Sequence, residues 1–403
     1  MATETSHASQ SYQNTNALSP KLRPANEPRW RPQMIRLSAS ALIVPAMALG
    51  LTSCSQIEST LSDVDSGFRS AVRSVESALV GKEHNQASAD TLRAAKLMDG
   101  DGVARDPQAA VALLRPHAEN GYAEAQLLLG LAYSAGQGVA KDRAKALHWY
   151  EKAADQNNAQ AQYLMGLARL NGDGIAKDTD KAAYWFAKGA ENGNAGAQYH
   201  LAIGLAGNDR FEEALRWLEV AARQGHADAQ YLAGEFYQIG RGTAGDKAWA
   251  THWFGKAAAQ GVVRAQYMLG LAYAAPSGVP RDLDKAYFWL AVASAGGDER
   301  ATEYRDKVGK LVAESQRSAI AARATKWQPT TDQADAVDDR PSLVFIQYAL
   351  SEAGYDPGPV DGLMGPRTGK AIARYREEHG IGGGSAINAA LLYSLKNEKA
   401  TAG

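Results

Sequence analysis

The sequence predicts an all-α protein, built as a solenoid of helix–turn–helix repeats and followed by a small three-helix domain. Two patterns that share a period of about 36 residues predict the solenoid. The first is an alanine–glutamine pair at positions 125–126, 161–162, 197–198, 229–230 and 265–266. The second is a tryptophan at Trp149, Trp185, Trp217, Trp253 and Trp289. Because each unit is long enough for two helices, the period predicts a stack in which neighbouring units share their core.

The charge balance and the cysteine content exclude several classes of protein. The chain has 403 residues, with 43 Lys and Arg against 44 Asp and Glu, and a net charge of −1. A nucleic-acid-binding protein would need a basic face, so we expect no nucleic acid partner. The single cysteine, Cys54, excludes an internal disulfide and a cysteine-rich metal site. We expect no cofactor.

Residues 1–53 have the features of a leader and a signal peptide. Basic residues precede an apolar run at 37–51, which is too short for a comfortable membrane span. The run ends in Leu51-Thr52-Ser53-Cys54, which resembles a bacterial lipobox. The resemblance implies that Cys54 is lipidated and becomes the mature N-terminus. The alternative is a plain signal peptide or anchor with a chance cysteine. Because Met34 would give a signal peptide of ordinary length, residues 1–33 are expected to be either untranslated or a long leader.

The segment 54–86 combines the anchor with an amphipathic helix. Ser55 follows the cysteine where an Asp would suggest inner-membrane retention, so the outer membrane is favoured. The apolar positions that follow recur at intervals of three or four, as on one face of a helix: Ile57, Leu61, Val64, Phe68, Val72, Val75 and Leu79. This stripe is expected to cap the solenoid, to lie on the membrane or to pair with a second copy.

Six repeats are expected over residues 87–297. In one unit, a first helix begins near Ala123 and a second follows Asp142, whose carboxylate is expected to cap it. Gly130 and Ala146 lack bulk, so the two helices can approach closely. We expect the repeat tryptophan, here Trp149, to fill the remaining core space.

The pattern A-Q-Y-x-L-G-x-x-Y-x-x-G-x-G-V-x-x-D-x-x-K-A-x-x-W-x-x-K-A-A resembles the Sel-1-like repeat, a relative of the tetratricopeptide repeat. The resemblance implies a right-handed α-solenoid that scaffolds protein complexes. Residues 298–327 are expected to form terminal capping helices, with Trp327 packed among them.

One row of first-helix positions is a possible groove for a partner helix or peptide. It contains Leu128, Leu164, His200, Leu232 and Met268. A second row follows three residues later, at Leu131, Leu167, Ile203, Glu235 and Leu271. Packing between repeats is the alternative role, and His200 and Glu235 fit that alternative least well.

The sequence indicates no catalytic site. No H-E-x-x-H, G-x-S-x-G or phosphate-loop motif occurs, and we expect no metal site. His148 and His252 precede repeat tryptophans at a position that is Tyr184, Arg216 or Phe288 elsewhere. A position that tolerates those residues is expected to be a solvated flank of the helix.

Residues 328–340 form an acidic linker, and residues 341–396 form a compact unit. Apolar positions predict a first helix that stops at Gly354, a second that opens at Pro366 and a third that is capped by Ser385.

The string G-Y-D-P-G-P-V-D-G-L-M-G-P-R-T-G-K-A-I in this unit resembles the peptidoglycan-binding domain of cell-wall hydrolases. Asp361, Gly362, Gly365 and Thr368 match the family motif and are expected to be structural, with glycines at positive φ. The resemblance implies wall binding, and we expect Arg367, Tyr375 and Arg376 to contact the ligand. The family's usual Phe-Gln is Tyr375-Arg376 here. A structural or protein-binding use of the same fold is the alternative.

Together these features predict a non-enzymatic envelope lipoprotein that binds peptidoglycan and holds an unidentified envelope protein, facing the periplasm. One alternative is a periplasmic regulator, or a polysaccharide-secretion or localisation factor, that works through its solenoid with a structural C-terminal domain. Another is an accessory chain that delivers a hydrolase to the wall.

Overall fold

The computed structural model describes residues 86–275, 277–329, 340–360 and 363–381, with Val72, Val75, Leu79, Leu391, Leu392, Ser394 and Leu395. Cys54, Asp361, Gly362 and Ser385 lie outside the described residues. Every regular element within the described ranges is a helix, as the sequence predicts. The helices in this part of the chain are all too short or too polar to span a bilayer.

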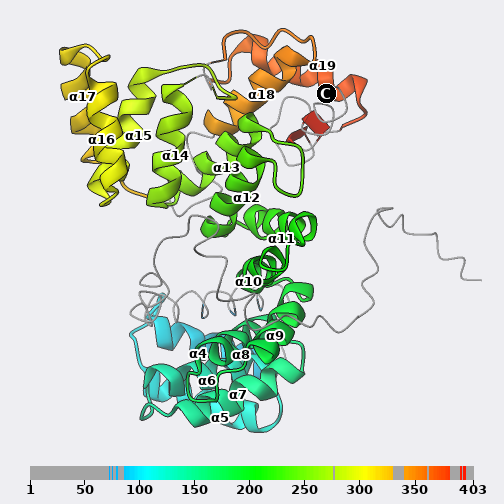
Figure 1. The fold of residues 1–403 in the computed structure, drawn as a ribbon. Helices are drawn as coiled ribbons and strands as arrows, with labels where there is room; N and C mark the ends of the chain where they lie inside the picture. Colours follow the sequence, from blue (N-terminus) through cyan, green and yellow to red (C-terminus); the bar gives the residue numbers. More distant parts are fainter. Residues whose placement is uncertain are drawn as a thin grey trace, which may run out of the picture. The chain divides into compact units, whose positions relative to one another are not determined.

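The repeats are pairs of antiparallel helices, each packed on the next in chain order (Figure 1). The six pairs are α4 (Gln86–Asp99) with α5 (Pro107–Glu119), α6 (Ala123–Ala135) with α7 (Arg143–Asp155), α8 (Ala159–Asn171) with α9 (Thr179–Glu191), α10 (Ala195–Ala206) with α11 (Phe211–Arg223), α12 (Ala227–Ile239) with α13 (Lys247–Ala259), and α14 (Val263–Ala274) with α15 (Leu283–Ala295). Two further helices, α16 (Glu299–Gly309) and α17 (Glu314–Ala324), pack on α15.

The aspartate of the repeat pattern begins the second helix, as expected. Asp142 accepts a hydrogen bond of 3.0 Å from the Lys145 backbone N–H, and Asp178 accepts one of 2.9 Å from Lys181. Each carboxylate satisfies an N–H that has no partner within the helix. The cap therefore fixes where the second helix starts.

The glutamine of the alanine–glutamine pair joins each unit to the one before it. The buried Gln162 Nε2 donates to the Ala154 carbonyl at 3.0 Å and its Oε1 accepts from Asn192 Nδ2 at 2.9 Å. The same bond to the carbonyl eight residues earlier is made by Gln126, Gln198, Gln230 and Gln266. A buried amide left unpaired costs about 1–3 kcal/mol, so these bonds fix the register between repeats.

The repeat tryptophan was expected to fill the core space beside the repeat glycine, and this expectation is wrong. The aromatic residue that follows the tryptophan fills that space instead. A Cβ on Gly166 would lie 2.5 Å from the Phe186 ring, and one on Gly130 would lie 2.7 Å from Tyr150. Both aromatic rings are buried, and each follows the repeat tryptophan by one position. Trp149, Trp185, Trp217 and Trp289 are only half-buried, while Trp253 is buried.

Glycines also allow consecutive repeats to approach each other. Gly136 ends α6 with φ of +74°, and Gly138 has φ of +70°. A Cβ on Gly138 would lie 2.1 Å from the Pro107 carbonyl oxygen at the start of α5. Any side chain there would separate the two repeats.

The apolar stripe before the first repeat is described at three positions. Val72, Val75 and Leu79 are helical and buried, in one cluster with Ala94 and Met98 of α4. Their burial favours the capping role among the three alternatives for this stripe.

The C-terminal domain contains α18 (Arg340–Glu352) and α19 (Pro366–Glu378), and the four described residues from 391 to 395 are helical. Pro366 opens α19, as expected. Ile346, Leu350, Ile372, Leu391 and Leu395 are almost fully buried. These residues form the inside of the small domain and belong to the same buried cluster as the later repeats.

Candidate interaction surfaces

The predicted groove residues divide into two groups. Leu128 and Leu232 are buried between repeats, which is the packing role that was the alternative for this row. Leu164, His200 and Met268 are half-buried and retain exposed surface. A role of these three in binding a partner stays a prediction.

A row of tyrosines lies beside these positions and was missed by the sequence reasoning. It comprises Tyr163, Tyr199, Tyr231 and Tyr267, each directly after the repeat glutamine. The Arg264 guanidinium lies 5.8 Å from the Tyr231 ring centre, and Arg300 lies 4.7 Å from that of Tyr267. The A-Q-Y pattern contained the signal, because a polar aromatic side chain at a fixed helical position lines one face of a stack.

His200 lies within this row, between two repeats. Its ring stacks on Phe186 with 4.6 Å between centroids, and Tyr163 lies 5.9 Å away. Burial, with His226 nearby, lowers the pKa of His200 to about 4. At neutral pH the imidazole is therefore uncharged.

Glu235 is the second polar member of the predicted rows. Its Oε1 accepts a hydrogen bond of 2.6 Å from the Tyr231 hydroxyl, and among the described residues its buried Oε2 has no partner. Burial raises the pKa of Glu235, although Tyr231 and Arg264 act in the opposite direction. This half-buried carboxyl is able to accept a donor from a bound molecule.

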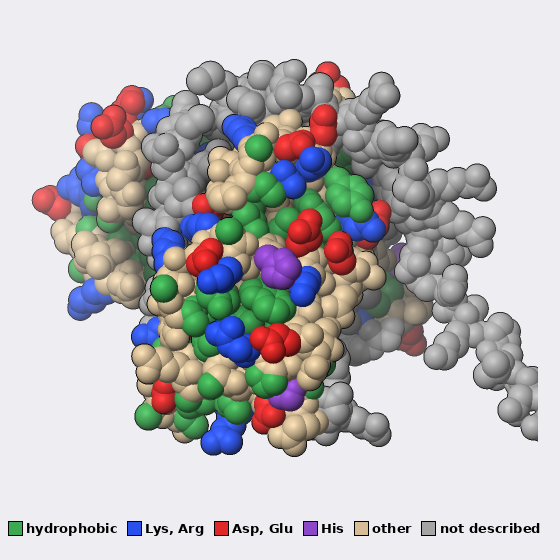
Figure 2. Space-filling view, turned by 90° about the horizontal axis from the view of Figure 1, so that it is seen from below, with side chains coloured by type: hydrophobic (Ala, Val, Ile, Leu, Met, Phe, Trp, Pro, Cys, Tyr) green, Lys and Arg blue, Asp and Glu red, His purple; other side chains and the backbone are tan. Residues whose placement is uncertain are grey.

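On the face shown in Figure 2, acidic, basic and apolar side chains are interspersed. The mixture agrees with the net charge of −1. Such a face does not offer the continuous basic stripe that binding to phosphates requires.

The predicted wall-binding side chains lie in different environments. Arg367 is exposed and forms an ion pair with the exposed Asp356. Leu363 and Met364, in the loop before α19, are 53% and 47% exposed. Among the described residues, this loop and Arg367 place exposed apolar and basic side chains next to each other.

Tyr375 and Arg376 are buried, contrary to the expectation that they face a ligand. Tyr375 is fully enclosed, its hydroxyl lies 2.9 Å from Ser394 Oγ and its ring stacks on His379. Arg376 is 2% exposed. Both positions fall on the face of α19 that closes the domain core, which their sequence separation from Ile372 permits on a helix.

Of the motif residues, Thr368 and Gly365 are described, and Thr368 has the expected structural role. Its Oγ1 donates to the Pro357 carbonyl at 2.8 Å and accepts from Gln347 Nε2 at 3.2 Å. Gln347 also donates to the Leu363 carbonyl, which fixes the loop on α18. Gly365 has φ of −93°, so the expectation of a positive φ at this glycine is wrong.

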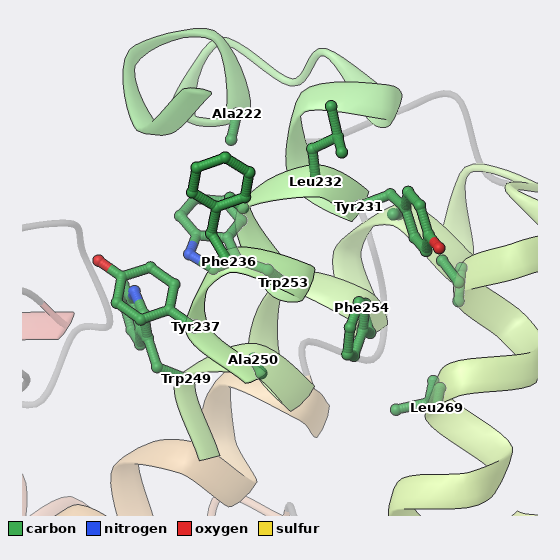
Figure 3. Packing of buried hydrophobic residues seen from close by; sticks show 14 of the residues in the cluster. Ala222, Tyr231, Leu232, Phe236, Tyr237, Trp249, Ala250, Trp253, Phe254 and Leu269 are labelled. Atoms are coloured by element: carbon green, nitrogen blue, oxygen red, sulfur yellow. The ribbon is translucent and has the colours of Figure 1, made fainter. Parts of the chain in front are cut away.

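The C-terminal domain also contacts the fifth repeat, through α18 and α13. Phe345 of α18 lies 4.6 Å from Trp249 and 6.2 Å from His252, centroid to centroid. His252 is 2% exposed, so the expectation of a solvated flank is wrong at this repeat. Figure 3 shows Trp249 beside Tyr237 at the edge of the cluster, close to the pale orange ribbon of α18.

Comparison with known families assigns both parts of the chain. The Sel1 repeat matches residues 92–122, 123–158, 159–194, 195–226, 227–262 and 263–298, which together make up half of the chain. A putative peptidoglycan binding domain matches residues 339–382. No curated protein matches the chain.

Several solved structures are similar to this chain, and two serve as examples. One is a protective antigen of uropathogenic Escherichia coli strains with an SLR fold, at 30% identity and a TM-score of 0.53, covering 62% of this chain. This chain spans 57% of that antigen's length. The other is a Sel1 repeat protein from Oxalobacter formigenes, at 32% identity and a TM-score of 0.48, covering 53% of this chain and 88% of that one.

Proposed function

The chain belongs to the Sel1 repeat proteins, and we propose that it is a non-enzymatic cell-envelope lipoprotein that binds peptidoglycan and scaffolds a protein partner. The repeats indicate a protein-interaction scaffold, and the C-terminal domain indicates peptidoglycan binding. The observation that carries the proposal is the presence of both parts in one chain. A scaffold with a wall-binding domain can hold its partner at the wall.

The lipobox-like sequence that ends at Cys54 supports an envelope location. A lipid on Cys54 would hold the mature chain at a membrane, most simply the outer membrane, with the repeats facing the periplasm. Each buried CH₂ contributes about 0.8 kcal/mol, and a single chain anchors only marginally, so two or three chains are needed.

The partner is expected to bind the row of half-exposed side chains on the first helices. Tyr163, His200 and Met268 offer aromatic and apolar surface, and Glu235 offers an acceptor. Rigid aromatic side chains contribute strongly to interfaces because little conformational entropy is lost when they are covered.

Wall binding is tested by pelleting the Cys54→Ser chain with purified sacculi. We expect it to sediment with them, whereas a chain that ends at residue 329 stays in solution. The shortened chain should carry Trp249→Lys, so that loss of the domain exposes no aromatic side chain. If both chains pellet equally, or neither does, the domain is not the wall anchor and the regulator alternative becomes the leading one.

Arg367 provides a finer test within the folded domain. Because a hydrogen bond to a charged group contributes about 1.5–3 kcal/mol, Arg367→Glu should weaken sacculus binding about tenfold or more. Lys145→Glu is the matched control, since Lys145 is 61% exposed on α7, away from the domain. Equal losses in both variants would indicate nonspecific charge attraction.

Lipidation is tested independently by following the Cys54→Ser chain during fractionation of the envelope. We expect it to leave the membrane fraction and to lack the mass of the lipid. A variant that stays membrane-bound with unchanged mass would contradict the lipoprotein assignment.

A further inference from the structure

The outer face of α13 departs from the repeat pattern at the position four residues before the repeat tryptophan. That position is charged in the second, third, fourth and sixth repeats, as Lys145, Lys181, Glu213 and Lys285. Lys145 and Lys181 are 61% and 60% exposed and pair with the capping aspartates. In the fifth repeat the residue is Trp249, which is fully buried.

A second departure lies three residues further on, along the same face of the helix. His148, Tyr184 and Arg216 are exposed at this position, and His252 is buried. The His252 ring stacks on Trp249 with 4.7 Å between centroids and 13° between planes. Phe288 of the sixth repeat is half-buried at the same position. Two large rings at positions that are exposed in the second and third repeats therefore form an apolar surface on α13.

One segment of this chain covers that surface, namely α18. Phe345 is fully buried against Trp249 and His252. Tyr348, one turn later, is half-buried, and its pKa is raised by burial, by Glu352 and by Asp246, the residue that caps α13. Phe345 and Tyr348 therefore lie on the side of α18 that faces α13.

The opposite side of α18 belongs to the C-terminal domain. Gln347 donates a hydrogen bond to the Leu363 carbonyl and so holds the loop. Because Gln347 is two positions after Phe345, the two side chains point in directions about 200° apart around the helix axis. The exposed residues Leu363, Met364 and Arg367 are thus attached to the side of α18 that faces away from Phe345.

The path of the chain favours this contact over a contact with another molecule. A Cβ on Gly261, in the turn after α13, would lie 3.0 Å from Pro329, so the chain passes α13 shortly before α18 begins at Arg340. Linkers this short give effective concentrations in the millimolar range. Even a modest apolar contact is then mostly formed.

We propose that the outer face of α13 is a docking site dedicated to the chain's own C-terminal domain. Docking holds the domain on the fifth repeat with the Leu363–Arg367 surface directed away from the solenoid. The domain is therefore an oriented part of the scaffold and not a freely tethered one. The contact stands on packing alone, so it holds whether or not the domain binds peptidoglycan.

Trp249→Lys tests the proposal because it gives the fifth repeat the residue type of its neighbours. We expect unchanged helical content, cleavage between residues 330 and 339 that is at least about tenfold faster by limited proteolysis, and a larger radius of gyration by X-ray scattering. Phe345→Ser should have the same effect from the other side of the contact. Lys181→Ala is the matched control on α9 and should change neither measurement. Wild-type proteolysis and dimensions in both Trp249→Lys and Phe345→Ser would overturn the proposal.

Cysteine pairing tests which molecule supplies the docked domain, since Cys54 is the only native cysteine. In the Cys54→Ser chain, Trp249→Cys with Phe345→Cys should crosslink within one molecule through a short bifunctional thiol reagent. Lys181→Cys with Phe345→Cys should not. Crosslinked dimers would show that a second copy supplies the domain, and absence of any crosslink would contradict docking; either result overturns the proposal.

Discussion

In the third repeat the outer surface of α9 presents Lys181 and Tyr184 to solvent, whereas the same positions in the fifth repeat, Trp249 and His252, lie buried under α18. Beneath these surfaces the two repeats are alike: Phe186 and Phe254 are buried, each against a glycine. The repeat frame therefore fixes the helices without fixing their outer faces. At the two positions where α9 carries Lys181 and Tyr184, α13 carries Trp249 and His252, and these two rings contact Phe345 of α18.

We expect the largest loss of stability when the buried phenylalanine that both repeats share is truncated. Phe186→Ala and Phe254→Ala should each lower the free energy of unfolding by about 3–5 kcal/mol, as large aromatic truncations in cores do. Urea denaturation followed by circular dichroism measures the loss. Tyr184→Ala, at a position that is 53% exposed, is the control and should change stability by less than about 0.5 kcal/mol. Equal losses at Tyr184 and Phe186 would refute the assigned core.

The repeat tryptophans should differ between the two regions because their burial differs. Trp253 is 4% exposed, so Trp253→Ala should lower the free energy of unfolding by about 3–5 kcal/mol. Trp185 is half-buried, so Trp185→Ala should cost about 1–2 kcal/mol. The same denaturation experiment separates them. A larger loss at Trp185 than at Trp253 would mean that burial does not govern this position.

The two regions should also differ in their response to pH. His200 stacks on Phe186, while the equivalent residue after Phe254 is Met268, which does not titrate. The pKa of His200 is about 4 against a usual 6.5, so the unfolded chain binds more protons between these values. Stability is therefore fully present above about pH 6.5 and falls by about 1–3 kcal/mol as the pH drops toward 4.

The matched variant for this pH effect is His200→Leu, because Leu164 and Leu232 occupy the neighbouring row positions. It should reduce the pH-dependent loss in urea titrations between pH 7 and 4. Some loss should remain, since burial also lowers the pKa of His226. An unchanged pH profile would exclude His200 as its source.

The smallest expected effect concerns the glycine that admits the aromatic ring. Gly166→Ala places a Cβ 2.5 Å from Phe186, and overpacking typically costs about 1–3 kcal/mol. Alanine has a higher helix propensity than glycine, which offsets up to about 1 kcal/mol of this cost. We therefore expect the free energy of unfolding to fall by about 1–2 kcal/mol, measured by thermal or urea unfolding. In the Phe186→Leu background, Gly166→Ala should lower the free energy of unfolding by less than it does in the wild-type chain, because the smaller side chain leaves room for the added Cβ. Simple additivity would indicate that the two positions do not touch.

Much of the repeat fold could be predicted from the sequence because its determinants are local and periodic. Asp142 was identified as a helix cap from its place before the second helix, and its hydrogen bond to Lys145 confirms it. The glutamine of the repeat was visible as a marker of the period. Its bond to the preceding repeat was not predicted, because the acceptor is a backbone carbonyl that has no sequence signature.

The core and the candidate sites were predicted less well because adjacent helical positions differ by about 100° around the axis. That rotation places Phe186 in the core and leaves Trp185 half-buried, although tryptophan is the larger and more regular marker. In the C-terminal domain the same geometry buries Tyr375 and Arg376, while Arg367 is exposed.

The helix type, the repeat period, the caps and the small C-terminal domain are predictable from the amino-acid sequence, since each depends on neighbours along the chain. The segment that covers a given helix face is set by tertiary packing instead. Trp249 and His252 follow the repeat register like any other pair, and they become an interface because Phe345, almost a hundred residues later, lies against them. A contact between segments that are distant in sequence depends on how the whole chain folds, and a local sequence pattern does not contain that information.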